Sequence, residues 1–403
     1  MTPLSSSGSW SVKVRPAGAH AAQPPVASGN SSRPERCPWQ TVWKAPGATC
    51  RAGCLSGGIT VTQRVDLERT DGNGVATAAP AASAQGAPVD LGTVQQVGSQ
   101  IAAAISQVVL GKPEVIRLAI IAVLAEGHLL IEDVPGTGKT VLAKSLARTV
   151  DSTVSRVQFT PDLMPSDVTG VSIYDRQTSQ FEFRPGPIFA NIVVADEINR
   201  ASPKTQSALL ECMEERQVTV DGTSYRLARP FLVLATQNPV EMEGTYPLPE
   251  AQRDRFLARL SIGYPDRNAE IGMLADRDRV DPLDQLRAVT DAAVVSKLID
   301  AVSTVHLAPP LRQYVVEIVG ATRSVPEVRL GASPRAVLHL AKAAKAAAAL
   351  DGRTFVVPDD VQRLAVPVLA HRLLLTVEAH AAHRSAEEVV MTLLNRIRVP
   401  RSG

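Results

Sequence analysis

Apolar residues recur at helical spacing over two consecutive stretches of the chain. The first is residues 91–111, LGTVQQVGSQIAAAISQVVLG, and the second is residues 112–127, KPEVIRLAIIAVLAEG. Apolar positions repeated every three to four residues indicate an amphipathic helix, and glycine commonly follows a helix end. The spacing predicts two successive helices, the first ending at Gly111.

Three shorter apolar runs fit buried strands better than helices. They are residues 128–133 (HLLIED), 191–197 (NIVVADE) and 229–238 (RPFLVLATQN). Continuous apolar runs of this length are typical of parallel strands that are covered on both faces. Because the first run leads through a glycine-containing loop into a helical stretch, 140–150, the pattern predicts an α/β fold with a parallel sheet.

A hairpin and a helical region complete the pattern. The β-like runs 170–175 (GVSIYD) and 180–186 (QFEFRPG) are separated by polar turn residues, which predicts a hairpin. Phe181 and Phe183 alternate on its second run, where they would either grip a substrate or pack on their own domain. Residues 354–373 predict a short extended piece followed by a capped helix.

These patterns divide the chain into four parts. We expect a disordered leader over 1–90, an α/β domain over 91–265, a linker over 266–290 and a helical domain over 291–400. Within the leader, residues 66–90 are rich in Ala, Gly and Pro, a composition typical of flexible segments.

The first sixty residues differ from the rest in composition. They hold all three Trp, three of the four Cys, six Lys or Arg and one acidic residue, Glu35. The abrupt change motivates the hypothesis that residues 1–60 are translated upstream sequence and that the native start is Val61 or later. Cys37, Cys50 and Cys54 lack the C-x₂-C spacing of zinc sites, so we expect disordered thiols.

Overall composition excludes several classes of protein. The 403 residues are 45% hydrophobic and 20% charged, with a formal net charge of +2, too small to favour nucleic acid or a membrane surface as partner. No window approaches the ~18 apolar residues of a membrane span. Four cysteines make no disulfide scaffold, so a reducing cytoplasm is the expected location. His371, His380 and His383 form no ligand pattern and are expected to be solvated.

The loop after the first strand nearly matches a phosphate-binding motif. The pattern G-x-x-x-x-G-K-[ST] fits at Gly138, Lys139 and Thr140, but Asp133 stands where the first glycine is expected. Such a loop points backbone N–H groups at phosphates, which requires the unusual backbone angles that Gly136 and Gly138 can adopt. The lysine would reach the β- and γ-phosphates, and the threonine hydroxyl would bind Mg²⁺.

An acidic pair ends the second strand, where ligands bind in open α/β sheets. Asp196 can hold Mg²⁺, and Glu197 can activate water for attack on a γ-phosphate. The third strand ends in Thr236-Gln237-Asn238, and a polar side chain there can orient that water. The alternative is that Asp196 and Glu197 are ordinary solvated acidic residues at a strand end. The glycine loop upstream disfavours this alternative.

Arginines further along the chain are candidates for contacts with phosphate. Arg253, Arg255 and Arg259 surround Asp254, and an arginine that reaches a neighbouring subunit would stabilise transition-state charge. Arg335 follows an N-cap serine in the first turn of a helix, where it opposes the helix dipole and suggests an external anion. Ordinary surface ion pairs are the alternative for each.

The chain resembles a AAA+ ATPase, and within that superfamily the MoxR family. The resemblance covers residues 91–400 and rests on the motifs VPGTGKT, FTPDLMPSDVTG, FRPGPIFANIVVADEINRASPKTQSALLECMEERQVTVDG, LATQNPVEMEGTYPLPEAQRDRF and ASPRA. It implies a P-loop αβα sandwich with a parallel sheet, a small all-α lid and an insert hairpin that projects into a ring pore. Members of the family often lack the first loop glycine, so the site is expected to work.

The resemblance also implies roles for single residues. It implies that Glu197, Asn238 as sensor 1 and Arg255 as the arginine finger take part in catalysis. Arg253 stands where an aliphatic residue is expected, which leaves open which arginine of this segment is the finger. Thr140 and Asp196 would hold Mg²⁺. The implied nucleotide-binding residues are Pro135, Gly136, Thr137, Gly138, Lys139, Thr140, Val141, Asp196 and, as sensor 2, Arg335.

The activity implied is Mg²⁺-dependent hydrolysis of ATP at the subunit interfaces of a homo-oligomeric ring, most simply a hexamer. MoxR relatives are thought to act as chaperones on protein clients, often beside proteins with von Willebrand factor A domains. One alternative is a magnesium-chelatase-like ATPase subunit, and another is a nucleotide-binding scaffold that never hydrolyses ATP. A transcription activator is disfavoured, because no GAFTGA loop lies between Met164 and Arg184.

Overall fold

The chain was analysed as a computed structural model that divides into two compact units, residues 1–62 and 63–403. The structure describes residues 69–70, 90–134, 136–238, 245–265, 267, 269–272 and 281–400, all in the second unit. Pro135 and the three cysteines of the leader, Cys37, Cys50 and Cys54, therefore lie outside the described residues.

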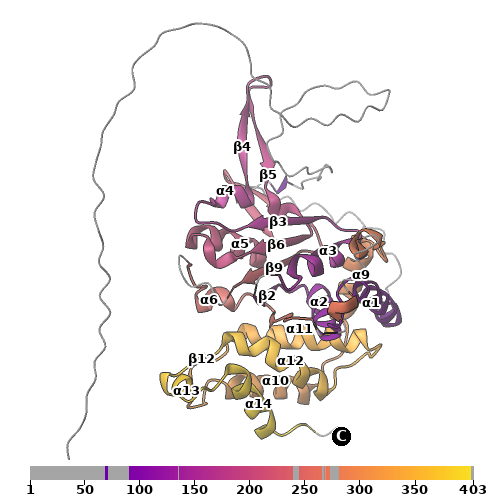
Figure 1. Cartoon of the computed structure of the whole chain (residues 1–403), viewed down its shortest axis with the longest axis vertical. Helices are drawn as coiled ribbons and strands as arrows, with labels where there is room; N and C mark the ends of the chain where they lie inside the picture. Colours follow the sequence, from indigo (N-terminus) through magenta and orange to yellow (C-terminus); the bar gives the residue numbers. More distant parts are fainter. Residues whose placement is uncertain are drawn as a thin grey trace, which may run out of the picture. The chain divides into compact units, whose positions relative to one another are not determined.

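A five-stranded parallel sheet forms the centre of this unit (Figure 1). Its strand order is β10-β2-β9-β6-β3, and every neighbouring pair is parallel. The strands are β2 (Leu129–Glu132), β3 (Val154–Gln158), β6 (Ile192–Asp196), β9 (Leu232–Gln237) and β10 (Ala258–Leu260). Because all five strands point the same way, their carboxyl ends meet at one edge of the sheet.

Alternate side chains of the strands enter two different hydrophobic clusters. Ile192 and Val194 of β6 pack with the helices α1 to α3, whereas Val193 and Ala195 pack on the opposite face with α5. This alternation follows from the two-residue period of a strand. The helices are α1 (Leu91–Ser106), α2 (Pro113–Leu124), α3 (Lys139–Thr149) and α5 (Pro203–Glu215). The predicted αβα sandwich is confirmed.

The C-terminal helices form a layer against the sheet domain (Figure 1). The elements that follow β10 are α8 (Pro282–Gln285), α9 (Ala292–Ser303), α10 (Pro309–Ala321), β11 (Val328–Leu330), α11 (Pro334–Leu350), α12 (Pro358–Leu369), η3 (Ala370–Arg372), β12 (Leu374–Leu375), α13 (Val377–Ala381) and α14 (Ala386–Arg396). Apart from the short pair β11–β12, the described residues of this region are helical or irregular, as expected of a lid.

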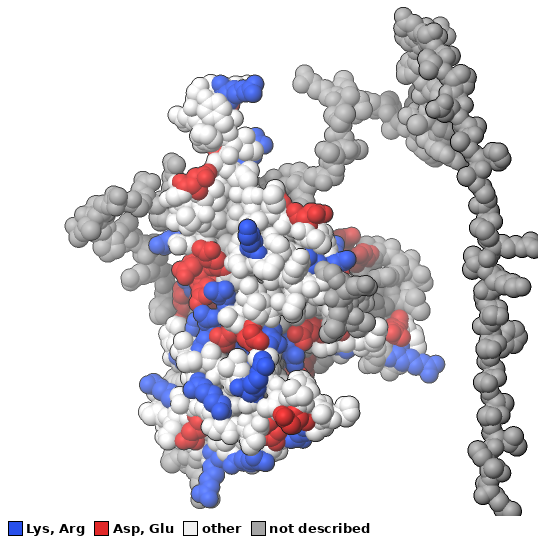
Figure 2. Space-filling view, turned by 90° about the vertical axis from the view of Figure 1, so that its left-hand side faces the viewer, with Lys and Arg blue, Asp and Glu red and all other residues white. Residues whose placement is uncertain are grey.

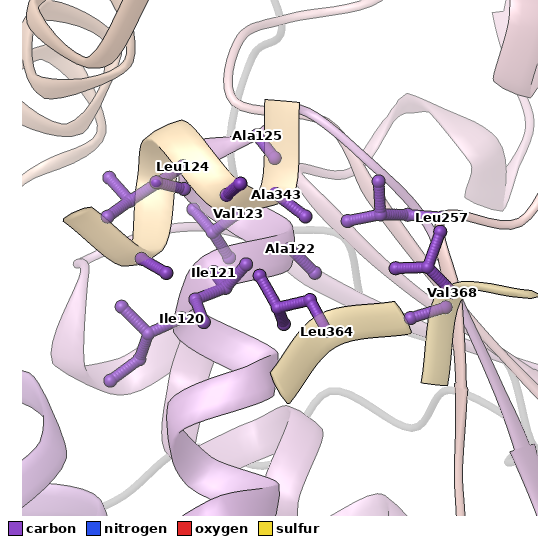
Figure 3. Packing of buried hydrophobic residues seen from close by; sticks show 14 of the residues in the cluster. Ile120, Ile121, Ala122, Val123, Leu124, Ala125, Leu257, Ala343, Leu364 and Val368 are labelled. Atoms are coloured by element: carbon purple, nitrogen blue, oxygen red, sulfur yellow. The ribbon is translucent and has the colours of Figure 1, made fainter. Parts of the chain in front are cut away.

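The lid and the sheet domain share one hydrophobic cluster. Figure 3 shows the side chains of Ile120 and Ile121 in α2 packed with Ala343 of α11 and Leu364 of α12. Val368, also in α12, reaches Leu257 at the start of β10 in the same view. Burial of each such Ile or Leu side chain contributes about 1.5–3 kcal/mol, so the lid is held against the sheet domain by apolar packing.

Two hairpins leave the sheet domain on its other side. The first is β4 (Gly170–Asp175) with β5 (Gln180–Pro185), and it projects from the top of the view in Figure 1. The second is β7 (Gln217–Val220) with β8 (Thr223–Arg226). Four short elements also belong to the sheet domain: α4 (Pro165–Thr169), η1 (Pro187–Phe189), η2 (Ile198–Arg200) and α6 (Glu250–Arg253).

The two phenylalanines of the projecting hairpin have different surroundings. Phe183 stacks on Tyr225 with ring centroids 4.2 Å apart and therefore packs on its own domain. Phe181 is 73% exposed and contacts Tyr174 edge to face. Two alternatives were left open for these rings. Phe181 fits contact with another molecule, and Phe183 fits packing on its own domain.

Several boundaries differ from the sequence prediction. Helix α1 ends at Ser106 rather than at Gly111, and the following residues are turns. Within the predicted leader, β1 (Arg69–Thr70) pairs antiparallel with β8. The prediction that His371 is solvated is wrong, because its side chain is buried, and burial holds its pKa well below the usual value. Among the described residues, no helix has the length and apolar character needed to cross a membrane.

Tight packing at the base of the projecting hairpin generates a stability prediction. A Cβ on Gly186 would lie 2.3 Å from the carbonyl oxygen of Val168 and 2.5 Å from the backbone nitrogen of Gly170. Backbone atoms cannot move aside as a flexible side chain can, so we expect Gly186→Ala to destabilise the fold by about 3 kcal/mol. Urea unfolding followed by circular dichroism would measure the change.

Gly222→Ala is the matched control. Gly222 has a φ of +77° but no atom within 4 Å of its Cβ position, so only the left-handed backbone opposes alanine, at about 1 kcal/mol. Equal unfolding midpoints for the two variants would contradict the crowding argument.

Candidate functional site

The glycine loop joins β2 to α3 at the carboxyl edge of the sheet. Gly136 and Gly138 have φ values of +84° and +88°, and neither has an atom within 4 Å of a Cβ position. Lys139 is the first residue of α3, and its Nζ donates to the carbonyl oxygens of Asp133 at 2.9 Å and Val134 at 2.8 Å. Burial lowers the pKa of the Lys139 ammonium, and nearby carboxylates partly offset this effect.

Asp133, which replaces the expected first glycine, fixes the loop to the end of β10. Its Oδ2 accepts hydrogen bonds from the backbone nitrogens of Ile262 and Gly263, both at 2.7 Å. Its Oδ1 accepts one from the backbone nitrogen of Val134 at 3.2 Å. The side chain is buried, so the carboxylate serves as the acceptor for backbone donors that would otherwise be unsatisfied.

The acidic pair lies at the end of β6, opposite the glycine loop. Asp196 Oδ2 accepts a hydrogen bond from Nε of Arg156 at 2.6 Å, and Oδ1 accepts one from the Thr236 hydroxyl at 3.2 Å. The Glu197 Oε2 atom accepts from Gln158 Nε2 at 2.7 Å and from Arg200 Nη1 at 2.9 Å.

The backbone at Glu197 is strained. Its φ and ψ are +55° and +50°, the left-handed region that residues with a side chain rarely adopt. The backbone N–H of Glu197 donates to the Thr236 hydroxyl at 2.9 Å, which helps to hold this conformation. The strain turns the Glu197 side chain toward Gln158 on the neighbouring strand.

One cavity of about 340 Å³ brings most of the predicted residues together. The predicted residues that line it are Gly136, Gly138, Lys139, Thr140, Val141, Asp196, Glu197 and Asn238. Thr236 and Gln237, which precede Asn238 at the polar end of the third predicted strand, also line it. Sequence reasoning missed two further lining residues, Arg156 and Gln158, because β3 was not predicted as a strand.

A second cavity, of about 220 Å³, adjoins the other side of the glycine loop. It shares Gly136, Gly138 and Val141 with the first cavity and also contains Thr137. Its remaining lining is mainly aliphatic side chains and backbone from three separate segments: Gln107, Val108, Val109, Leu110, Lys112, Ile262, Gly263, Pro265, Asp281, Pro282 and Leu283. No motif in the sequence indicated this cavity.

Arg255 and Arg335 lie outside both of these cavities and beside each other. Nε of Arg255 donates to Oε2 of Glu214 at 2.7 Å, and Nη2 of Arg335 bonds to Oε1 of the same carboxylate. Arg335 also lies 3.5 Å from Asp254. The position of Arg335 in the first turn of its helix suggested an external anion as its partner. In the structure its partners are instead two carboxylates of its own chain, Glu214 and Asp254.

The other two arginines of the segment have different surroundings. Arg259 pairs with Glu132 at 2.8 Å and with Glu387 of the lid. The Nε of Arg253 is buried and has no hydrogen-bond partner among the described residues. A third cavity, of about 220 Å³, contains both Arg255 and Arg335 but neither of these arginines. This grouping favours Arg255 as the finger.

The first cavity fits a nucleotide triphosphate with Mg²⁺. The space around Gly136 and Gly138 leaves the backbone accessible to phosphates, and Lys139 supplies a cation at the start of a helix. The described residues contain no cluster of three or more His, Cys, Asp or Glu. Magnesium needs no such cluster, because it is usually held by one or two protein oxygens together with phosphates and water. Thr140 and Asp196, which both line this cavity, are the residues that would hold Mg²⁺.

Two family models match the chain. The model described as "ATPase family associated with various cellular activities (AAA)" matches residues 128–258. The model of the AAA lid domain matches residues 320–393. The first range contains the glycine loop and the acidic pair, and the second contains helix α11, which carries Arg335 in its first turn.

Several relatives cover most of the chain. The protein YeaC of Bacillus subtilis is 51% identical over 296 residues, which is 73% of this chain and 92% of YeaC. Chaperone MoxR1 of Mycobacterium tuberculosis is 38% identical over 80% of this chain and 86% of its own length. Protein MoxR of Paracoccus denitrificans is 34% identical over 68% and 87%.

A solved structure has the same fold. The crystal structure of a protein from Cytophaga hutchinsonii, proposed to be an ATPase, matches with a TM-score of 0.73 and 38% sequence identity. The match covers 77% of this chain and 97% of that protein. It extends the likeness from the motifs to the arrangement of the sheet domain and the lid.

The contacts of Asp133 predict that restoring the phosphate-loop pattern weakens nucleotide binding. Asp133→Gly creates G-x-x-x-x-G-K-T, but it leaves the buried backbone donors of Ile262 and Gly263 without their acceptor. We expect ATP affinity to fall about tenfold, because an unsatisfied buried donor costs about 1–3 kcal/mol. Titration with a fluorescent ATP analogue would measure the dissociation constant.

Asp133→Asn is the control for this variant, because one side-chain oxygen is kept and the loss should be smaller. Unchanged or tighter binding by Asp133→Gly would contradict a tethering role for the carboxylate.

Proposed function

Because the chain belongs to the MoxR family of AAA ATPases, we propose that it hydrolyses ATP with Mg²⁺ and uses the energy to remodel or mature partner proteins. The observation that carries the proposal is the single cavity in which the glycine loop, Asp196–Glu197 and Asn238 meet. A loop that binds phosphate, an acid that can accept a proton and a polar side chain near both are the parts that hydrolysis requires.

In this proposal the glycine loop and Lys139 hold the β- and γ-phosphates. Thr140 and Asp196 hold Mg²⁺, which when bound neutralises charge on the phosphate oxygens. Asn238 orients a water, and Glu197 accepts its proton as the water oxygen attacks the γ-phosphorus. The bond from the γ-phosphorus to the bridging oxygen breaks, and ADP and phosphate leave.

Glu197 must exchange partners before it acts as a base. Its Oε2 is shared by Gln158 and Arg200, and two donors lower the basicity of a carboxylate. The carboxylate therefore has to turn from these donors toward the attacking water when ATP binds.

The second cavity is the proposed site for the adenine base. It adjoins the glycine loop, and aliphatic residues such as Val109 and Ile262 line it. A mostly apolar cavity with accessible backbone groups suits a flat heterocycle that forms a few hydrogen bonds.

Arg255 and Arg335 support hydrolysis across a subunit interface. Neither arginine lines the cavity that holds the glycine loop of its own chain. We propose that a neighbouring copy presents its γ-phosphate to them, which requires head-to-tail contacts that close into a ring, most simply a hexamer. The proposed domains are 91–265 for nucleotide binding and 291–400 for the lid, joined by the linker 266–290.

The client is proposed to be a protein, with a von Willebrand factor A domain protein as a possible co-partner and a reducing cytoplasm as the setting. One of the relatives carries the name chaperone, and the projecting hairpin offers the exposed Phe181 for contact. A magnesium-chelatase-like role and a non-hydrolysing scaffold remain the alternatives. The scaffold is disfavoured because it has no use for Glu197 beside the phosphate loop.

Single substitutions would test hydrolysis. We expect Glu197→Gln to lower kcat at least about a hundredfold and Arg255→Ala about a thousandfold, with ATP affinity nearly unchanged for both. Turnover per subunit of the parent should rise with protein concentration, because the site is completed only by assembly. A phosphate-release assay and nucleotide titration measure these quantities. A parent that binds ATP and hydrolyses none at any concentration would support the scaffold.

Mixed rings would test whether the arginine acts across the interface. Glu197→Gln subunits cannot hydrolyse ATP but carry Arg255, and Arg255→Ala subunits have the reverse defect. If the finger acts on a neighbour, mixing the two inactive proteins restores activity. Absence of restored activity would contradict catalysis between subunits.

A further inference from the structure

We propose that Glu214 is the positioning residue that holds Arg255 and Arg335 ready for the phosphate of a neighbouring subunit. The inference rests on the proposed function, in which these arginines act across an interface. It adds a carboxylate outside the nucleotide cavity to the groups on which catalysis depends.

One carboxylate joins two arginines from distant parts of the chain. Glu214 lies near the end of α5, Arg255 lies between α6 and β10, and Arg335 lies in the first turn of α11 in the lid. Oε2 of Glu214 accepts from Arg255 at 2.7 Å, and Oε1 pairs with Arg335. The shared carboxylate therefore sets the spacing between an arginine of the sheet domain and an arginine of the lid.

The geometry leaves the outer end of Arg255 available. Glu214 bonds to Nε, the nitrogen nearest the backbone. Among the described residues, neither Nη group of Arg255 has a hydrogen-bond partner, and its side chain is 30% exposed. The guanidinium is thus oriented by one edge while its other N–H groups can bind a phosphate, whose oxygens match this fork.

The two arginines need an anion between them. Guanidinium groups remain charged at all relevant pH values, so two of them that are brought together repel each other. Glu214 neutralises one of these charges, and Asp254 contributes further negative charge 3.5 Å from Arg335. Without the carboxylate the long arginine side chains would separate into solvent and lose their common direction.

The position of Glu214 in α5 gives an independent indication. A helix carries partial negative charge at its C-terminus, so an acidic residue in the last turn is unfavourable. Helix α5 ends at Glu215 with no basic residue in that turn. Contacts with Arg255 and Arg335 offset this cost for Glu214, whereas the adjacent Glu215, which is also exposed, has no ion pair among the described residues.

Helix α5 also gives Glu214 a fixed location relative to Glu197, the proposed catalytic base. The helix begins after Ser202, five positions beyond Glu197 in the sequence. Gln206 anchors its first turns by donating to the carbonyl oxygens of Ile198 and Ala201 at 3.1 and 3.2 Å. Glu214 is the twelfth residue of the helix, so a rise of ~1.5 Å per residue places it roughly 17 Å from Pro203 along the helix axis.

The surface around this pair suits a second copy of the chain. The cavity that contains Arg255 and Arg335 also contains Arg216 and Lys342, so basic groups predominate where a neighbour would present phosphates. Leu338, one turn after Arg335 on α11, also lines it and is 63% exposed. On the face in Figure 2, basic side chains gather over the lower part, which holds the lid helices.

Mixed rings of full-length chains test the role of Glu214. In each mixture, Arg255→Ala subunits supply intact nucleotide sites. A second type of subunit, called the donor, carries Glu197→Gln and supplies Arg255 and Arg335, and three donors are compared. The donors are Glu197→Gln alone, Glu197→Gln with Glu214→Gln, and Glu197→Gln with Glu215→Gln. We expect the Glu214→Gln donor to restore about tenfold less activity, since misplaced catalytic groups lose at least that much. The KM for ATP should stay the same, because the substrate binds in the other subunit.

The Glu215→Gln donor is the matched control, with the same charge change one residue away, and should restore as much activity as the simple donor. Light scattering must show equal assembly for all donors. Equal or greater rescue by the Glu214→Gln donor, or loss of its assembly, would overturn the positioning role. Rescue by none of the donors would instead overturn catalysis between subunits, and the inference with it.

Discussion

The buried guanidinium of Arg372 fixes the loop that carries Arg255. It donates to the Asp254 carboxylate at 3.0 Å and to the carbonyl oxygen of Phe256 at 2.5 Å, so it holds the residues on both sides of Arg255, the proposed finger. It also donates to Nδ1 of His339 in α11. Burial lowers the pKa of Arg372 to about 10. A cation buried this deeply is tolerated only with such partners, so the lid and the loop are tied together.

Because of these contacts, the orientation of the Arg255 side chain depends on the lid as well as on the sheet domain. Arg372 and Arg335 belong to the lid, Arg255 belongs to the sheet domain, and Asp254 contacts both lid arginines. The hydrophobic cluster that runs from α2 through α11 and α12 holds the same boundary by apolar packing (Figure 3). Under the proposed function, a displacement of the lid would therefore change the finger that the subunit offers to its neighbour.

Local patterns in the sequence were sufficient for strands β2, β6 and β9, the glycine loop and the acidic pair, because each depends on residues that are close in sequence, whereas β3 and the three-residue β10 were not predicted. They were not sufficient where contacts between residues distant in sequence determine the surroundings of a side chain. Arg335 was expected in the nucleotide cavity, yet it lies against Glu214, 121 positions earlier in the chain. Phe181 and Phe183 look equivalent in sequence, and only the stacking of the second on Tyr225 separates them. His371 likewise gave no local sign of burial.

Both halves of the proposed catalytic machinery already form ion pairs within the chain. Asp196 pairs with Arg156, and Glu197 pairs with Arg200. In the other half, Arg255 and Arg335 share Glu214. A bound nucleotide must therefore compete with the existing contacts of the two acids, so only the difference in free energy favours the active arrangement. Under the proposed function a docked neighbour meets no such competition at Arg255, because Glu214 occupies its Nε and leaves both Nη groups for the phosphate.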